Sequence, residues 1–164
     1  MIAVIQRVNS AEVIADGILS GKIGKGLYIL LGIEKGDDSS DAIALADKIS
    51  KLRIFSDENG KMNLSVTSIE GEALSVSNFT LCANYVHGNR PDYFNAELPE
   101  AAKKLYLLFN DEITKRVGKC EAGIFGADMQ TTMTTDGPVT IFMDSYVLLR
   151  KERKTDDLKN QRRY

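Results

Sequence analysis

The stretch GLYILLGIE, residues 26–34, decides the fold, because it is almost continuously apolar and is bounded by glycine and charge. A run of this length and composition predicts a β-strand that is buried on both faces. A sheet built around such a strand has to be covered, so the rest of the chain must supply neighbouring strands and a covering layer.

Further strand patterns surround this run on both sides. Before the run come IAVIQRV, AEVIA and, after a turn at Asp16-Gly17, ILSGKIG. After it come MNLSVTSIEGEALSVSNFTLCA around Glu70-Gly71 and, near the end, FGADMQTTMT and VTIFMDSYVLL. The alternation of residues 75–81 predicts a strand with Ser75, Ser77, Phe79 and Leu81 on one face. Gly137 and Pro138 interrupt the last pattern, because proline has no N–H for a sheet ladder.

Two segments have helical spacing. GDDSSD offers capping residues before a helix in which Ile43, Ala46, Ile49 and Leu52 recur. Pro99 opens a second helix, and Gly118 stops it. That helix carries Leu105, Phe109 and Ile113 on one side. The chain therefore predicts a single α+β domain, a barrel-like and mostly antiparallel sheet with two covering helices. We place this domain at residues 1–145, followed by a basic C-terminal extension at residues 146–164 that is not a separate domain.

The composition restricts the function classes. The 164 residues are 43% apolar and 27% charged, with a net charge of −2, so no global charge indicates a nucleic-acid partner. No apolar run approaches the ~18 residues of a membrane span, and the first residues lack a signal-peptide pattern, so we expect a cytoplasmic protein without a membrane partner. Residues 150–164 hold seven Lys/Arg against three Asp/Glu, which is typical of a solvated helix and can also contact a polyanion.

The usual catalytic motifs are missing from the sequence. There is no G-x-S-x-G elbow, no G-x-x-x-x-G-K-[ST] loop and no H-E-x-x-H. The one histidine, His87, stands in a Gly-containing loop typical of the surface, which argues against a serine–histidine triad. Two distant cysteines, Cys82 and Cys120, with one histidine exclude a four-ligand Cys/His zinc site, and we expect both thiols to be reduced.

Five short motifs occur in an order that resembles the D-aminoacyl-tRNA deacylase family: IQRV, SNFTL, GNRPDYF, FGADM and DGPVTI. The resemblance runs from Met1 to about Asp144. The signatures of that family are S-Q-x-T and N-x-G-P-x-T, and this chain matches them at Ser77, Thr80, Gly137, Pro138 and Thr140. It departs from them at Asn78, where glutamine is usual, and at Thr135, where asparagine is usual.

The resemblance implies a hydrolase that cleaves the ester of D-aminoacyl-tRNA, and of mischarged glycyl-tRNA(Ala), without a cofactor. It also implies a homodimer with active sites at the subunit interface. In the family the Gly-Pro bond is cis and enters the active site of the other subunit. Gly137 and Pro138 would then reject L residues, whose side chains would collide with that corner.

The resemblance also assigns roles to individual residues. The catalytic group comprises Ser77, Asn78, Phe79 and Thr80, with backbone donors around Phe79 and Thr80 holding the ester carbonyl. Phe125, Met129 and Thr140 would line the substrate and adenosine pocket, although core packing explains the first two as well. Arg7 would brace the Gly-Pro corner, and Asn89, Arg90 and Pro91 would shape the rim of the pocket. Two mechanisms stay open, one assisted by the tRNA 2′-hydroxyl and one with Thr80 as nucleophile.

Two other functions compete with editing. A nucleic-acid-binding barrel of the same fold would have lost catalysis through Asn78 and Thr135. A threonine-dependent hydrolase of small esters would use the hydroxyl-rich strands.

Overall fold

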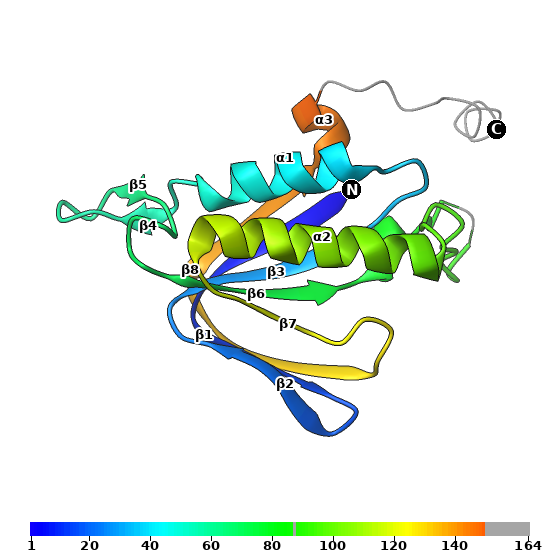
Figure 1. Ribbon diagram of the computed structural model, residues 1–164, viewed down its shortest axis with the longest axis horizontal. Coiled ribbons are helices and arrows are strands. Elements are labelled where there is room, and N and C mark those ends of the chain that lie inside the picture. Colours follow the sequence, from blue (N-terminus) through cyan, green and yellow to red (C-terminus); the bar gives the residue numbers. More distant parts are fainter. Residues whose placement is uncertain (87, 150–164) are drawn as a thin grey trace.

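The chain folds into one large curved sheet with two long helices lying side by side over it (Figure 1). This computed structural model describes residues 1–86 and 88–149, so His87 and the basic residues 150–164, with the expectations about them, lie outside it. The elements are β1 (Ile2–Ala15), β2 (Ile18–Ile23), β3 (Gly26–Gly32), α1 (Ser39–Ser50), β4 (Phe55–Ser56), β5 (Met62–Leu64), β6 (Glu72–Ser77), the 3-10 helix η1 (Phe79–Cys82), α2 (Pro99–Val117), β7 (Cys120–Ala122), β8 (Met129–Asp144) and α3 (Ser145–Leu149).

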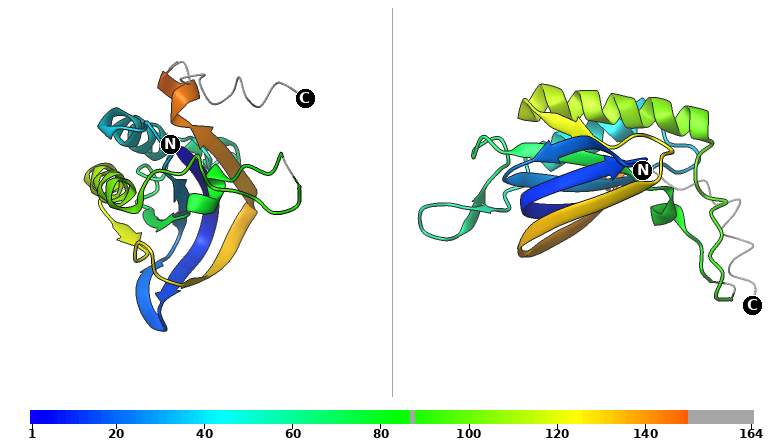
Figure 2. Two further views of the ribbon diagram at one scale, coloured as in Figure 1. Left: turned by 90° about the vertical axis from the view of Figure 1, so that its right-hand side faces the viewer. Right: turned by 90° about the horizontal axis from the view of Figure 1, so that it is seen from below.

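The large sheet has the strand order β2-β1-β3-β6-β7, and β8 pairs with β1. The first half of β1 lies between β3 and β8, and its second half lies between β2 and β8. The long β1 and β8 curve together, and this curls the sheet (Figure 2). The β1 pairs are antiparallel, whereas β3–β6 and β6–β7 are parallel. The expected α+β domain with a barrel-like, mostly antiparallel sheet is confirmed.

The strand that decided the fold is buried as expected. Leu27, Tyr28, Ile29 and Leu31 of β3 are almost fully inaccessible, and the first, third and fourth belong to the core shared with α1 and α2. Burying each large aliphatic side chain stabilises the fold by ~1.5–3 kcal/mol.

Both long helices begin where the sequence indicates. Asp38 and Asp41 form a capping box at the start of α1. Pro99 is the first residue of α2, and Gly118 ends it with a φ of +93°. The expected apolar stripe of α1 is confirmed at Ala46 and Ile49, which are buried together with Ala42 and Leu45. It is wrong at Ile43, which is 41% exposed, and Leu52 lies beyond the helix, where it packs against the core.

The strand expected over residues 75–81 is confirmed only as far as Ser77. Strand β6 ends at Ser77, and η1 starts at Phe79. Asn78 is the N-cap of η1, because its side chain accepts a hydrogen bond from the Thr80 N–H. Polar alternation alone did not distinguish a continuing strand from a capped turn.

The Gly-Pro pair does not divide the last strand. β8 runs continuously through it, and the Gly137–Pro138 peptide bond is cis. The pairing passes from Gln6↔Thr140 to Val8↔Thr135, so four residues of β8 bulge opposite Arg7. A strand that pairs along one side only tolerates proline, because its other edge needs no N–H donor.

The end of the expected last strand is helical, since α3 follows β8 directly at Ser145. Within residues 1–86 and 88–149, none of the helices has the length and apolar character that crossing a membrane requires.

Candidate functional site

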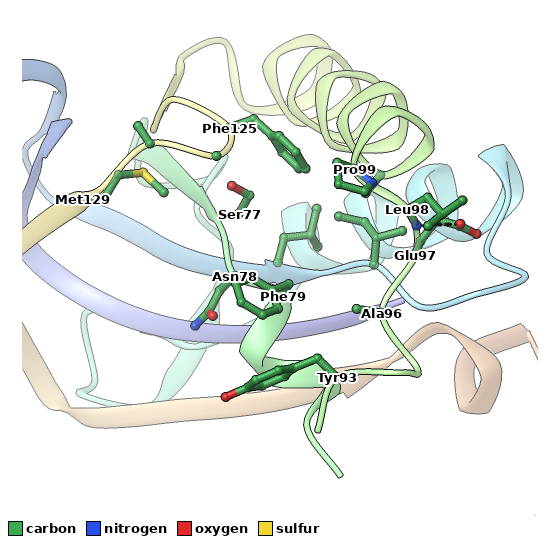
Figure 3. Close-up of a pocket in the computed structure, with 15 residues that line it drawn as sticks. Ser77, Asn78, Phe79, Tyr93, Ala96, Glu97, Leu98, Pro99, Phe125 and Met129 are labelled. Atoms are coloured by element: carbon green, nitrogen blue, oxygen red, sulfur yellow. Dashed lines mark hydrogen bonds between the residues drawn. The ribbon is translucent and has the colours of Figure 1, made fainter. Parts of the chain in front are cut away.

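A cavity of about 520 Å³ opens between the end of β6, the start of α2 and the loop before β8 (Figure 3). Its volume is in the range of small-molecule sites, and its surface is mainly apolar. The lining residues are Leu31, Ile33, Ser77, Asn78, Phe79, Tyr93, Ala96, Glu97, Leu98, Pro99, Ala102, Phe125, Gly126, Ala127 and Met129.

The wall formed by Ser77, Asn78 and Phe79 is fixed to β3. The Asn78 N–H donates to the Leu31 carbonyl at 2.8 Å, which continues the parallel ladder by one residue. Gly32 faces η1 so closely that an added Cβ would lie 2.9 Å from Leu81 Cβ and 3.2 Å from the Asn78 carbonyl oxygen. A glycine at this position therefore sets the distance between η1 and the sheet.

Asn78 and Thr80 are joined by two hydrogen bonds. Asn78 Oδ1 accepts from the Thr80 N–H at 3.2 Å and also from the Thr80 hydroxyl. Thr80 is exposed and does not line the cavity, whereas Asn78 does. One of the two backbone donors expected to hold a carbonyl thus already has an acceptor within the protein.

The opposite wall carries Phe125 and Met129. The Tyr106 ring lies 5.9 Å from that of Phe125, and its hydroxyl lies 2.9 Å and 3.1 Å from the carbonyl oxygens of Ser75 and Gly123. Burial raises the pKa of Tyr106, so this hydroxyl stays a donor. Gly123 leaves room for Met129, whose sulfur would lie 2.6 Å from an added Cβ.

The mouth of the cavity is aromatic and apolar. Phe79 is 59% exposed and meets Tyr93 edge to face, with ring centroids 4.9 Å apart. Leu98 is 68% exposed at the start of α2. Ring faces of this kind suit a planar base or an aromatic side chain of a ligand.

The Gly-Pro corner lies elsewhere in the same chain. Gly137 and Pro138 are exposed, and neither lines the cavity. Arg7 approaches this corner from β1, because its Nε lies 3.2 Å from the Asp136 carbonyl oxygen and 3.0 Å from the Asp136 carboxylate. The guanidinium also donates through Nη1 to the Ile54 carbonyl, so it is held on two sides.

The structure brings together only part of the expected site. Ser77, Asn78, Phe79, Phe125 and Met129 line one cavity. Thr140 instead pairs with Gln6 on β1, with 3.4 Å between Gln6 Nε2 and Thr140 Oγ1. Asn89, Arg90 and Pro91 are exposed in their loop and do not line the cavity.

The sequence reasoning missed the α2 side of the cavity. Leu98, Pro99 and Ala102 line this side, and Tyr93, two residues after Pro91, lines the cavity as well. The sequence predicts Pro99 only as the start of a helix. The position of Pro99 in the first turn of α2 could have indicated this side of the cavity, because the start of a helix often faces a ligand site.

The cavity lining contains few side chains that could act as a general base. Among the described residues that line it, Glu97 is the one acid, and its carboxylate accepts from the Leu98 N–H at 2.7 Å. At the end of η1, burial raises the pKa of Cys82 to about 12, so its thiol is not a nucleophile at neutral pH. No set of three His, Cys, Asp or Glu within residues 1–86 and 88–149 is placed to hold a metal ion. The arrangement is suited to binding and polarising a substrate through hydrogen-bond donors.

Known proteins resemble this chain over most of its length. A family model described as D-Tyr-tRNA(Tyr) deacylase matches residues 4–144. The chain is 52% identical to a D-aminoacyl-tRNA deacylase of Persephonella marina over 148 residues, 90% of this chain and 100% of that protein. It is 52% identical to a D-aminoacyl-tRNA deacylase of Akkermansia muciniphila over 143 residues, 87% of this chain and 95% of that one. The solved structure of a c-Myc DNA unwinding element binding protein has a TM-score of 0.82 and 39% identity, covering 88% of this chain and 98% of that chain.

Proposed function

The chain belongs to the D-Tyr-tRNA(Tyr) deacylase family, and from this premise we propose that it is a hydrolase that cleaves the ester of D-aminoacyl-tRNA in the cytoplasm. Mischarged glycyl-tRNA(Ala) is a further substrate in this proposal, because glycine, like a D residue, has no side chain on the L side. L-aminoacyl-tRNA is rejected.

One observation carries the proposal: Ser77, Asn78 and Phe79 face Phe125 and Met129 across a single apolar cavity. We assign Phe125 and Met129 to the terminal adenosine, since an aromatic ring and a polarisable thioether both pack on a base face. The aminoacyl ester then reaches the wall at the end of β6, where hydrogen-bond donors are available.

The chemistry needs no strong base from the protein. An ester is an activated acyl group, so positioning and polarisation of its carbonyl give a large part of the acceleration. The backbone N–H of Phe79 precedes the first internal hydrogen bond of η1 and serves as a donor to the carbonyl. The 2′-hydroxyl of the tRNA assists the attacking water. Nucleophilic attack by Thr80 has less support, because its hydroxyl proton is donated to an amide oxygen, which is a very weak base.

A second copy of the chain completes the site in this proposal. Gly137 and Pro138 form a corner that is exposed and does not line the cavity of their own chain, so the corner is available to a partner subunit. Arg7 and Asp136 brace the corner. It faces the α-carbon of the aminoacyl group bound to the partner, where an L side chain would collide with it while the hydrogen of a D residue or of glycine would fit.

Deacylation of three charged tRNAs tests the function. We expect rapid hydrolysis of D-Tyr-tRNA and Gly-tRNA and the uncatalysed rate with L-Tyr-tRNA, which serves as the matched control. Tight tRNA binding without turnover would instead favour the non-catalytic nucleic-acid-binding barrel. Turnover of simple esters without turnover of any tRNA would favour the small-ester hydrolase.

The terminal ribose tests the mechanism separately. D-Tyr-tRNA whose last nucleotide is 2′-deoxyadenosine, charged at the 3′ position, lacks the assisting hydroxyl, and we expect its kcat to fall by about 10²–10⁴. The KM should change little, because the adenine and amino acid still bind. A deoxy substrate that is cleaved at the ordinary rate would contradict assistance by the 2′-hydroxyl and would revive Thr80 as the nucleophile.

A further inference from the structure

The loop between β7 and β8 carries one side of the cavity. β7 ends at Ala122, β8 begins at Met129, and residues 125–127 and Met129 line the cavity. The position of this side therefore depends on how the two ends of the loop are held. At the end next to β8, the Asp16 N–H donates to the Asp128 carbonyl at 3.0 Å, and the Asp128 N–H donates to the Asp16 carboxylate at 3.3 Å.

Two hydroxyl groups hold the end of the loop next to β7, and we call them the carbonyl clamp. The Ser20 hydroxyl donates to the Ala122 carbonyl at 2.8 Å. The Tyr106 hydroxyl lies 2.9 Å from the Ser75 carbonyl oxygen and 3.1 Å from the Gly123 carbonyl oxygen, so the two acceptors share its proton. The Gly123 N–H also donates to the Ser75 carbonyl, at 2.9 Å, and this ties the start of the loop to β6.

The Ser20 half of the clamp joins the two ends of the strand order β2-β1-β3-β6-β7. An added Cβ on Gly21 would lie 3.1 Å from Glu121 Cβ and 3.3 Å from the Ala122 nitrogen. Glycine at this position therefore lets β2 approach β7 closely enough for the short serine side chain to reach a carbonyl.

The Tyr106 half of the clamp connects the loop to the helix on the other side of the cavity. Tyr106 is 1% exposed on α2, four residues after the cavity-lining Ala102 and therefore on the same face of the helix. Its ring lies 5.9 Å from that of Phe125, which Figure 3 shows next to α2. One side chain thus holds the backbone at Gly123 and packs near the ring of Phe125.

We propose that Tyr106 and Ser20 are positioning residues for deacylation, which act through the carbonyl clamp to hold Phe125, and with it the terminal adenosine, in register with the end of β6. The proposal rests on the proposed function, which assigns Phe125 to that base. Loosening the wall weakens binding of the adenosine in the ground state and the transition state alike, so loss of the clamp raises KM more than it lowers kcat.

The variant Tyr106→Phe tests the clamp, because it removes the hydroxyl and keeps the ring. We expect KM for D-Tyr-tRNA to rise about 3–10-fold with little change in kcat. The Kd of adenosine 5′-monophosphate, which matches the last nucleotide of tRNA, should rise by a similar factor. Wild-type values of both constants in Tyr106→Phe would overturn the proposal.

Tyr28→Phe is the matched control for this change. Tyr28 is also almost fully buried, and its hydroxyl bonds to the side chain of Thr131, outside the cavity lining. We expect this variant to lower the melting temperature by an amount similar to Tyr106→Phe while both constants stay at wild-type values. An equal rise of KM and Kd in the two variants would show that general loss of stability is the cause and would overturn the positioning role.

Two Ser20 variants test the other half of the clamp. Ser20→Ala removes the donor to Ala122, and we expect the Kd of adenosine 5′-monophosphate to rise about 2–5-fold. Ser20→Thr keeps a hydroxyl at the same position and should restore the wild-type Kd. Wild-type affinity in Ser20→Ala would overturn the role of Ser20.

An NMR titration with adenosine 5′-monophosphate separates this inference from the proposed function. We expect the nucleotide to shift the methyl signal of Met129 in the wild type, and to do so only at higher concentration in Tyr106→Phe. A wild type that shows this shift but cleaves no charged tRNA would contradict only the proposed function. A wild type that cleaves D-Tyr-tRNA while the nucleotide leaves the Met129 signal in place would overturn the inference and leave the proposed function standing.

Discussion

Asn78 is one carbon shorter than the glutamine that is usual in the S-Q-x-T signature, and the length decides what its amide can reach. Asparagine is among the best N-cap residues because its oxygen meets the N–H two or three residues ahead, whereas glutamine caps poorly. In Asn78→Gln we therefore expect the Thr80 N–H to be released and to become a further donor to the carbonyl. Deacylation should be equal to wild type or higher. A loss of more than about tenfold would show that the shorter, capped amide is itself required.

The two cysteines predict a particular dependence of stability on pH. Burial raises the pKa of both Cys82 and Cys120 from 9.0 to about 12. Above pH ~9 the unfolded chain releases thiol protons that the folded protein keeps, so the free energy of unfolding falls as pH rises through this range. Melting temperatures between pH 8 and 11 should decline less steeply in the Cys82→Ala, Cys120→Ala variant than in wild type. Equal slopes would contradict the assignment.

At the scale of elements, the sequence predicted which segments form strands and helices more accurately than it predicted where each segment ends. The apolar run of β3 and the cap and stop of α2 were readable because burial and capping leave local patterns. The end of β6 was not, since Ser77 to Leu81 alternates as a strand would and only the Asx turn at Asn78 ends it. The bulge in β8 was equally hidden, because it depends on pairing with Arg7 on β1, more than a hundred residues away.

The packing of η1 on β3 gives a prediction for Gly32. An alanine there would place its Cβ 2.9 Å from Leu81 Cβ and 3.2 Å from both the Asn78 carbonyl oxygen and Cys82 Sγ. η1 must then move away from the sheet and carry Asn78 and Phe79 with it. We expect Gly32→Ala to cost about 1–3 kcal/mol of stability and at least tenfold in kcat.

Gly24→Ala is the matched control for this change. The nearest atom to its added Cβ is Glu72 Oε2 at 3.8 Å, an ordinary contact. Its kcat should equal that of wild type. If Gly32→Ala were also fully active, the spacing between η1 and β3 would not control the site.

At the scale of the whole molecule, one chain leaves the expected site in two parts. The cavity holds Asn78, Phe79, Phe125 and Met129, and the Gly137–Pro138 corner stands on an exposed strand outside it. Motif order placed the residues of both parts along the sequence. The order of the motifs does not predict the distance between the cavity and the Gly137–Pro138 corner within one chain, because that distance depends on how β8 crosses the curled sheet.

A mixed dimer tests whether the two parts meet across subunits. Pro138→Trp should project a large ring into the cavity of the partner and abolish deacylation. Asn78→Asp should disable the cavity of its own chain, because it adds a negative charge to the wall where the ester carbonyl becomes negative. When the two variants are mixed, half of the dimers are heterodimers, and each holds one cavity with an intact Asn78 facing an intact Pro138. We expect recovery of about a quarter of wild-type activity on D-Tyr-tRNA, with L-Tyr-tRNA still rejected. If the corner acted within its own chain, both cavities of every heterodimer would be defective, and the mixture would stay as inactive as its components.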